Sequence, residues 1–136
     1  MNAPRKPASS RSSLIRVGSL LLTKAAVAGP SGVKVVKLLV DTGSVYTILP
    51  VEVLESVGCS PAVSTDHVRL ITGSGYLIVP RVRTSWLQCL GQKVDQMAVV
   101  AHTLPFGSLV NGLLGTDFLR LLHARILITE GVIELP

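Results

Sequence analysis

A chain of 136 residues is long enough for one domain and too short for two lobes. With 48% hydrophobic and only 15% charged residues, it can bury a core. The net charge of +5 bears on solubility and encounter with partners rather than on the fold. No apolar run approaches the roughly 20 residues that span a membrane, so we expect no stable membrane anchor.

The first residues are rich in Pro, Ser and Ala and have no apolar periodicity. We therefore expect 1–13 to be a flexible basic tail, followed by one domain at 14–136. Its basic residues are too few to indicate nucleic-acid binding. The apolar segment 14–22 is interrupted by Arg16 and does not read as a signal peptide, so we expect a cytoplasmic protein.

Short runs of Val, Leu and Ile, broken by 12 Gly and 8 Pro, favour many short strands over long helices. In chain order we expect strands at 14–24, 33–40 (after a turn at 26–31), 46–49, both arms of a hairpin within 68–80, then 81–89, 94–101, 113–114, 125–128 and 132–135. Short helices are expected at 50–58, with Pro at its start and Gly past its end, and at 117–122.

The cysteines and histidines do not indicate a cofactor. Cys59 and Cys89 have no redox or metal-ligand spacing, and we expect free thiols. His67, His102 and His123 are scattered and lack the paired spacing of metal ligands. We therefore expect neither a metal nor any other cofactor.

Three local patterns occur in a fixed order. Residues 38–44 read LLVDTGS, an apolar strand that stops at one carboxylate and a tight turn, and a second apolar strand follows. Residues 73–79 read GSGYLIV at the expected hairpin, and residues 112–115 read GLLG. Each pattern alone is more often an ordinary turn or hairpin, but their order and spacing together point to one family of folds.

Taken together, these patterns resemble the retropepsin-like aspartic proteases, the one-domain proteases of retroviruses and their cellular and bacterial relatives. Residues 113–119, LLGTDFL, are similar to the cellular and bacterial branch. The resemblance runs from about residue 14 to residue 135. It implies a mainly β fold with a closed, barrel-like sheet, a flap hairpin and one or two short helices, in which the strand at 113–114 crosses beside the active turn.

The resemblance implies an aspartic endopeptidase in which two aspartates activate a water molecule. The chain has a single Asp-Thr-Gly, so the second Asp41 must come from a second copy in a homodimer. By resemblance, the Thr42 hydroxyl bonds across the dimer, and Gly43 leaves its N–H free for the carboxylate. A Ser44 hydroxyl that donates to Asp41 would favour the ionised form. Asp117 is expected to begin or cap a helix rather than to catalyse.

By the same resemblance, a polypeptide substrate lies between the dyad and the flap, and apolar groove walls suggest cleavage between hydrophobic side chains. We expect Gly73 and Gly75 to supply positive φ at the hairpin tip, and residues 72–76 to be mobile without ligand. The expected substrate-contacting residues are Leu39, Ser44, Val45, Tyr46, Val110 and Leu113 around the dyad, and Thr72, Gly73, Ser74, Gly75 and Tyr76 in the flap.

The chain departs from the viral pattern in two places. Viral enzymes pin the dimer with acidic residues after the active turn and an Arg after the later Gly, whereas this chain has Val45, Tyr46 and Thr116 there. The flap tip carries Thr72 and Ser74 where viral tips are richer in Gly and Ile. Two alternatives stay open, a peptide-binding module of the same fold that does not cut and a structural dimerisation domain; the intact Asp-Thr-Gly favours the enzyme.

Overall fold

The computed structural model describes residues 9–105 and 109–136. Two short α-helices and a 3-10 turn accompany the strands of these residues: α1 (Val51–Ser56), α2 (Thr116–Leu121) and η1 (Pro61–Val63). The strands are β1 (Ser10–Ser13), β2 (Ile15–Val17), β3 (Leu20–Gly29), β4 (Gly32–Val40), β5 (Ile48–Leu49), β6 (His67–Thr72), β7 (Gly75–Arg83), β8 (Trp86–Cys89), β9 (Gln92–Asp95), β10 (Ala98–Ala101), β11 (Gly112–Leu114), β12 (Arg125–Leu127) and β13 (Val132–Leu135). The fold is mainly β, as the sequence predicted.

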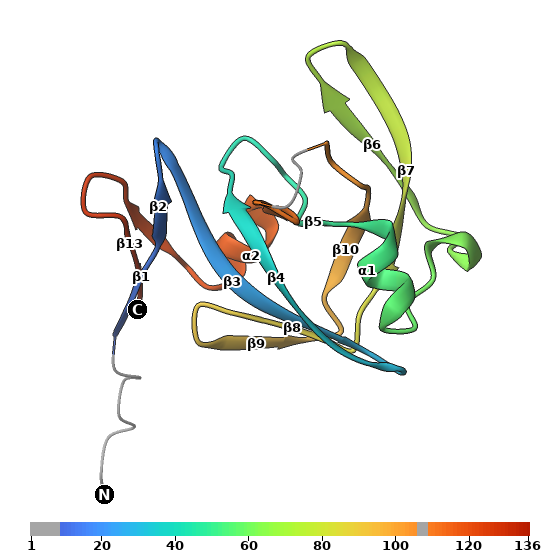
Figure 1. The fold of residues 1–136 in the computed structure, drawn as a ribbon, viewed down its shortest axis with the longest axis horizontal. Helices are drawn as coiled ribbons and strands as arrows, with labels where there is room; N and C mark the ends of the chain where they lie inside the picture. The colour runs from blue at the N-terminus through green and yellow to red at the C-terminus, as the bar shows by residue number, and fades with distance from the viewer. Residues whose placement is uncertain (1–8, 106–108) are drawn as a thin grey trace, which may run out of the picture.

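One large sheet forms most of the molecule. Its strand order is β6-β7-β10-β5-β11-β4-β3-β8-β9, with β2 paired to β3, and it curls into a half-barrel (Figure 1). A small sheet of order β1-β13-β12 brings the two ends of the described chain together. The hairpin of β6 and β7 projects from the body at the other end of the molecule (Figure 1).

A strand crossing at the middle of the large sheet positions the candidate site. Strand β11 lies between β4 and β5, parallel to β4 through Leu113 and Leu39 and antiparallel to β5 through Leu113 and Ile48. The chain leaves β4, turns at residues 41–47, and returns as β5 on the far side of β11. All three residues of β11 are buried, as expected for a strand covered on both faces. The crossing that the resemblance implied is therefore present.

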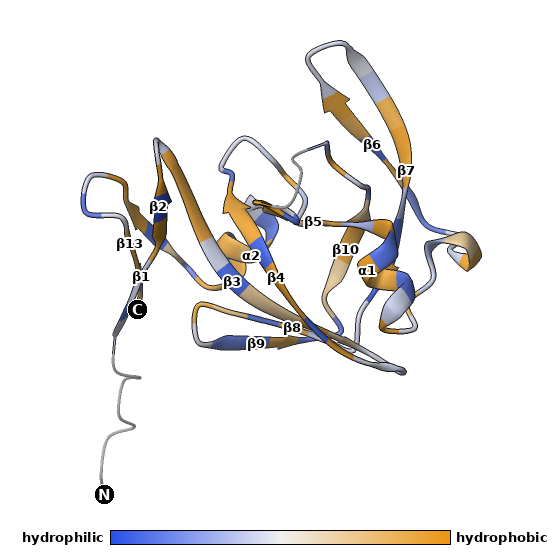
Figure 2. Ribbon diagram, in the orientation of Figure 1, coloured by the Kyte–Doolittle hydropathy of each residue, from blue (hydrophilic) through white to orange (hydrophobic). Residues whose placement is uncertain are grey.

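The apolar side chains form two clusters. The larger one fills the half-barrel and includes Phe118 of α2, Leu54 of α1 and Leu38 of β4, all with no exposed area. A smaller cluster of Ile48, Val79, Val100 and Leu113 lies beneath the hairpin. Figure 2 shows the apolar runs of β3, β4 and β5 in orange and the mostly polar β9 in blue. Full burial of each large apolar side chain contributes about 1.5–3 kcal/mol, so the larger cluster is the main source of stability.

Several elements lie where the sequence placed them. The hairpin within 68–80 is β6–β7, whose arms pair from His67 and Pro80 to Thr72 and Gly75. The helices expected at 50–58 and 117–122 are α1 and α2, and the final two strands are β12 and β13. Cys59 and Cys89 are free thiols, as predicted, and both are buried.

The predicted strand 14–24 and turn 26–31 are wrong. Residues 14–24 are divided between β2 and β3 at Gly18, whose φ of +58° marks a tight turn. Strand β3 then continues to Gly29, pairing with both β4 and β8, so only residues 30–31 turn. Ala25, Ala26 and Ala28 have weak strand propensity, but pairing with β4 on one side and β8 on the other keeps them in the strand.

The long strands predicted at 81–89 and 94–101 are each interrupted. Strand β7 ends at Arg83 and pairs with β10, whereas β8 and β9 pair with each other on the opposite side of the sheet. The chain changes sides at two neighbouring points, where Thr84 N–H donates to the Met97 carbonyl and Gln96 N–H donates to the Ser85 carbonyl, both at 2.9 Å. Because the apolar pattern of the sequence continues through both breaks, no sequence signal marks where these strands end.

The predicted boundary of the basic tail also changes. Residues 10–13 form β1, paired with β13, and Arg11 lies 3.5 Å from Glu134. Long-range pairing orders this segment, which has no apolar pattern of its own. Residues 1–8, with Arg5 and Lys6, lie outside the described residues. In the part of the chain that the structure describes, no helix has the length and apolarity needed to span a membrane.

Candidate active site

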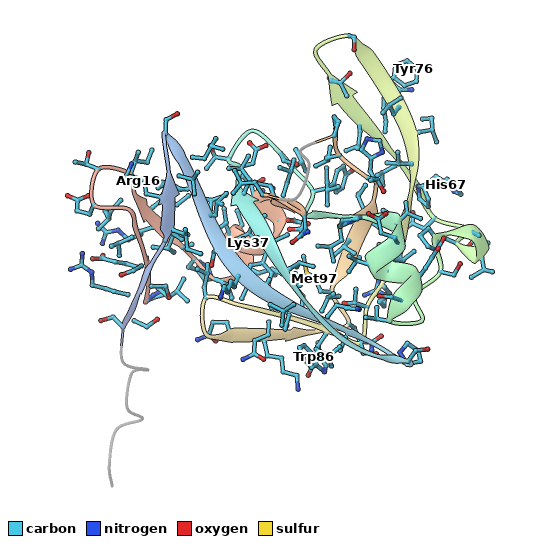
Figure 3. All side chains as sticks on the ribbon, viewed as in Figure 1. Arg16, Lys37, His67, Tyr76, Trp86 and Met97 are labelled. Carbon is cyan, nitrogen blue, oxygen red and sulfur yellow. The ribbon has the colours of Figure 1, made fainter. Side chains whose placement is uncertain are left out.

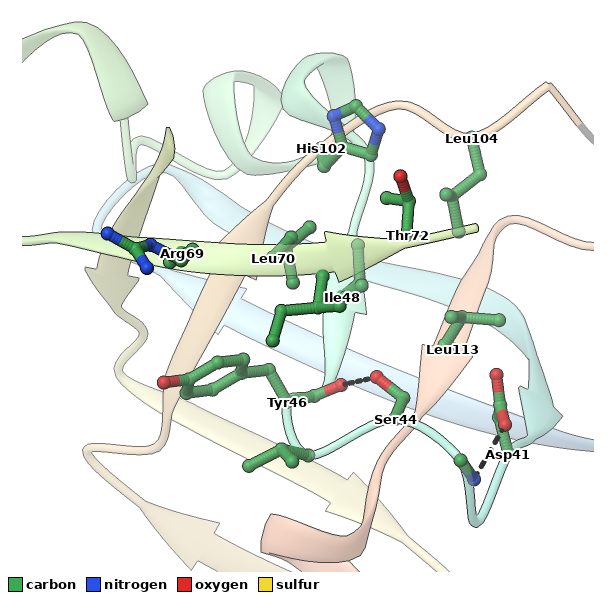
Figure 4. A pocket seen from close by; sticks show the side chains of 13 residues that line it. Asp41, Ser44, Tyr46, Ile48, Arg69, Leu70, Thr72, His102, Leu104 and Leu113 are labelled. Carbon is green, nitrogen blue, oxygen red and sulfur yellow. Dashed lines mark hydrogen bonds between the residues drawn. The ribbon is translucent and has the colours of Figure 1, made fainter. Parts of the chain in front are cut away.

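The turn between β4 and β5 holds one carboxylate in a defined pose. At its start, the Asp41 N–H donates to the Leu114 carbonyl of β11 at 3.0 Å. The Gly43 N–H then donates to Asp41 Oδ1 at 2.9 Å, the contact expected from the sequence (Figure 4). Ser44 N–H closes the turn on the Asp41 carbonyl at 3.2 Å. The backbone therefore fixes the Asp41 side chain at the end of β4.

The expected contact between Ser44 and Asp41 is absent from the structure. The Ser44 hydroxyl donates instead to the Tyr46 carbonyl at 2.7 Å, which tightens the second half of the turn (Figure 4). A hydroxyl two residues before a carbonyl can reach it locally, and this local bond wins over the one to the carboxylate. Ser44 therefore stabilises the turn and is not a hydrogen-bond donor to the Asp41 carboxylate.

The N-terminus of α2 supports the turn from below. The backbone N–H groups of Thr116 and Asp117 donate to the carbonyls of Ser44 and Val45, at 2.8 and 3.1 Å. The turn thus satisfies helix donors that have no partner inside the helix. Gly115 makes this approach possible, because a Cβ there would collide with the Tyr46 carbonyl. Asp117 lies in the first turn of α2, one residue after the helix starts at Thr116, and the N-cap residue is Gly115, without a side-chain cap bond.

A groove of about 380 Å³ opens above the turn, between it and the inner side of the hairpin (Figure 4). Of the residues predicted from the sequence, the groove is lined by Asp41, Gly43, Ser44, Val45, Tyr46, Thr72 and Leu113. The structure therefore brings the turn, the crossing strand and the start of the hairpin tip to one cavity.

Other predicted residues do not line the groove. Leu39 packs against the smaller core cluster, and Val110 is buried. Thr42 is exposed at the turn and lines a second hollow beside α2. The rest are the tip residues 73–76, which extend beyond the groove. Among these, Tyr76 projects from the hairpin and is 60% exposed (Figure 3).

The two faces of the hairpin explain where Tyr76 points. Val68 and Leu70 alternate on the inner face and pack against the smaller core cluster. Ile71 and its cross-strand partner Tyr76 lie on the other face, and the Arg69 guanidinium stacks on the Tyr76 ring at 4.5 Å. Leu70 and Thr72 therefore close one side of the groove, Arg69 and Ile71 border it from the other face of the same strand, and Tyr76 does not line it.

Gly75 and Gly73 differ at the tip. Gly75 has a φ of +132°, where L side chains are strained, as expected from the sequence. Gly73 does not have positive φ, so the prediction for this residue is wrong. A Cβ at either position would meet no atom within 4 Å. The tip needs only one glycine for its conformation.

Sequence reasoning missed several groove residues: Ile48, Arg69, Leu70, Ile71, His102 and Leu104. Leu70 could have been found, because it stands two residues before Thr72 and so shares its face of the strand. His102 and Leu104 follow β10, which lies beside the turn only because it pairs in parallel with β5 through Val100 and Ile48. No local pattern signals that pairing.

The charges around the groove are few. Asp41 is its only carboxylate among the described lining residues, and Arg69 and His102 are the basic ones. At the base of the hairpin, Arg81 lies 2.7 Å from Asp66. The hydrogen bond to Asp66 raises the pKa of Arg81, and this contact holds the hairpin base to the preceding loop.

Comparison with known proteins agrees with this geometry. A family model described as aspartyl protease matches residues 23–118, and the chain belongs to that family. Among solved structures, the chain is similar to the crystal structure of a retropepsin-like aspartic protease from Rickettsia conorii, with a TM-score of 0.70 and 16% sequence identity. The match covers 94% of this chain and 91% of that one, and at this identity it establishes the fold. A search of curated proteins gives no match.

Proposed function

We propose that this chain is an aspartic endopeptidase that hydrolyses peptide bonds at a dyad of Asp41 residues from two copies. The observation that carries the proposal is the pose of Asp41. Its carboxylate is fixed by the Gly43 N–H at 2.9 Å, and it lines the groove between the turn and the β6–β7 hairpin. A carboxylate oriented by backbone in an open groove is suited to proton transfer rather than to core packing.

The proposed chemistry requires two such groups. One carboxylate takes a proton from water while the other gives a proton to the carbonyl oxygen of the substrate. Two carboxyl groups a few ångströms apart do not both ionise easily, so the pair shares one proton and titrates as a unit. The sequence has one Asp-Thr-Gly, and the proposal therefore needs a two-fold dimer with Asp41 near its axis.

Exposure at the turn supports a dimer of this kind. Thr42 is exposed, and Val45 is 65% exposed although it is apolar. Both flank Asp41, where a second turn would have to lie. We propose that the Thr42 hydroxyl bonds across the dimer and that the two Gly43 amides hold the two carboxylates in matching poses.

The proposed substrate is a polypeptide with hydrophobic side chains at the cleaved bond. Among the residues that line the groove, Ile48, Leu70, Leu104 and Leu113 are apolar. We propose that the tip, residues 72–76, moves onto a bound peptide. The proposed location of the enzyme is cytoplasmic.

Cleavage of a peptide library at pH 3 to 7, with and without pepstatin, tests the proposal. We expect pepstatin-sensitive cleavage at apolar sites, with specific activity that falls about tenfold for each tenfold dilution well below the dimer dissociation constant. A folded dimer that cuts nothing at any pH would instead support the peptide-binding module. An active monomer, identified by sedimentation at assay concentration, would overturn the shared dyad.

A further inference from the structure

A second carboxylate, Asp117, is hydrogen-bonded to Thr47, the last residue of the turn between β4 and β5. Thr47 donates twice to it: the backbone N–H to Oδ2 at 2.9 Å, and the hydroxyl to Oδ1 at 2.7 Å. The two residues are separated by 70 positions in the chain. The carboxylate thus clamps the end of the turn opposite to Asp41.

The contacts between Thr47 and Asp117 lie in the protein interior, and each residue makes a further hydrogen bond to the backbone of a neighbouring residue. Thr47 has no exposed area, and its hydroxyl oxygen accepts the Gly115 N–H at 3.2 Å. Asp117 Oδ1 also accepts the Phe118 N–H at 2.7 Å. No Lys or Arg forms an ion pair with Asp117 within residues 9–105 and 109–136. The carboxylate therefore has hydrogen-bond donors as its only polar partners there.

Each part of the turn is tied to the same short segment, residues 114–117. Asp41 is held by Leu114, Ser44 by Thr116, Val45 by Asp117, and Thr47 by the Asp117 side chain. All but the last of these are backbone contacts, which most substitutions would preserve. Two side chains add to them: the Thr116 hydroxyl donates to the Ser44 carbonyl at 3.3 Å, and the Asp117 carboxylate accepts two bonds from Thr47, at 2.9 and 2.7 Å. With two shorter bonds, the Asp117 side chain is the stronger of these two supports of the turn.

We propose that Asp117 is a positioning residue for the reaction, which acts through Thr47 to keep the Asp41 carboxylate oriented. The expected effect on catalysis rests on the proposed function. The expected effect on the order of residues 41–47 rests on the hydrogen bonds alone. A carboxylate suits the role because both of its oxygens accept, whereas an amide would turn one N–H₂ toward a Thr47 donor. Asp117 does not touch the groove and takes no part in proton transfer.

Thr47→Val and Asp117→Asn test the inference, with Thr84→Val as the matched control. Thr84 is also a buried threonine, whose hydroxyl donates to the Met97 carbonyl at 2.9 Å away from the groove. We expect kcat to fall about 100-fold in Thr47→Val with KM within about twofold, because small misplacements of a catalytic group have effects of that size. Thr47→Ser, which keeps the hydroxyl, restores kcat, and Thr84→Val leaves kcat unchanged.

Amide hydrogen exchange supplies a readout that needs no activity. The amides of 41–47 should exchange faster in Thr47→Val and Asp117→Asn than in wild type, and not in Thr84→Val. Unchanged kcat and unchanged exchange at 41–47 would overturn the inference, and should Thr47→Val not fold, Asp117→Asn decides. A wild-type dimer without peptidase activity would count against the proposed function, and exchange alone would then decide whether Asp117 holds the turn.

Discussion

The active turn and the β6–β7 hairpin face each other across one groove, and they are held in opposite ways. The turn, residues 41–47, is bonded to β11 and α2 at both ends and in its middle. The part of the hairpin beyond its base is bonded only within itself, and the base is tied to the body by the pairing of Arg81–Arg83 with β10, by the packing of Val68, Leu70 and Val79, and by the Arg81–Asp66 pair. All of residues 71–78 are exposed.

This difference suits two tasks. Under the proposed function, Asp41 transfers protons and must keep its geometry, and the surrounding structure over-determines its turn. Under the same proposal, the hairpin tip covers different peptides and must move, which suits a segment with few contacts to the body. Substitutions in each region test whether the turn is rigid and the hairpin tip mobile.

Asp41→Asn should have the largest effect. The amide can still accept the Gly43 N–H but can neither take nor share a proton, so we expect turnover to fall about 10⁴-fold. Thermal midpoint and dimer content, measured by calorimetry and sedimentation, should stay at wild-type values. Turnover within tenfold of wild type would show that Asp41 is not the catalytic acid.

Gly75→Val should have an intermediate effect, confined to turnover. The φ of +132° strains any L side chain by about 1–3 kcal/mol, and the tip can relax because nothing packs on it. We expect turnover to fall about tenfold and the thermal midpoint to change little. Gly73→Val is the matched control, since Gly73 has equal space without positive φ, and should retain more activity. Equal activity in both variants would make the hairpin an ordinary surface turn.

Alkylation of the buried thiols should have the smallest effect of the three, and we expect no change in turnover. Cys89 lies in the body on β8, and burial raises its pKa to about 11; burial also raises the pKa of Cys59. Since only the thiolate reacts, the folded protein should be alkylated at Cys89 about 100-fold more slowly at pH 8 than the unfolded chain. The rate should keep rising with pH up to about 11. Fast labelling of the folded protein, followed by mass spectrometry, would show that the body opens as readily as the hairpin.

Local patterns were enough to predict the turn and the hairpin that border the groove. Asp41 follows an apolar strand and precedes a tight turn, and both features are read from neighbouring residues. The β6–β7 hairpin and both short helices are likewise local. The mainly β fold followed from the resemblance of these patterns in their order.

Parts that depend on pairing across the sheet were not predictable in this way. His102 reaches the groove through the parallel pairing of β10 with β5, and β1 is ordered by β13 at the other end of the chain. The hydroxyl of Ser44 had two acceptors in reach, and only the geometry of the turn decides between them. Asp117 was expected at the start of a helix, but its bond to Thr47 needed the crossing of β11 to be known.

Strand β6 also has a consequence for how the free protein behaves in solution. It is an edge of the large sheet, so one row of its backbone N–H and C=O groups is unpaired. Ile71 of β6, and Tyr76 and Ile78 of the paired strand β7, are each more than half exposed on this hairpin. Such an edge can add a strand from any neighbouring chain, and at high concentration the nearest one is the hairpin of another molecule. Any chain that pairs along β6 would cover this row and so protect the free protein from association through this edge.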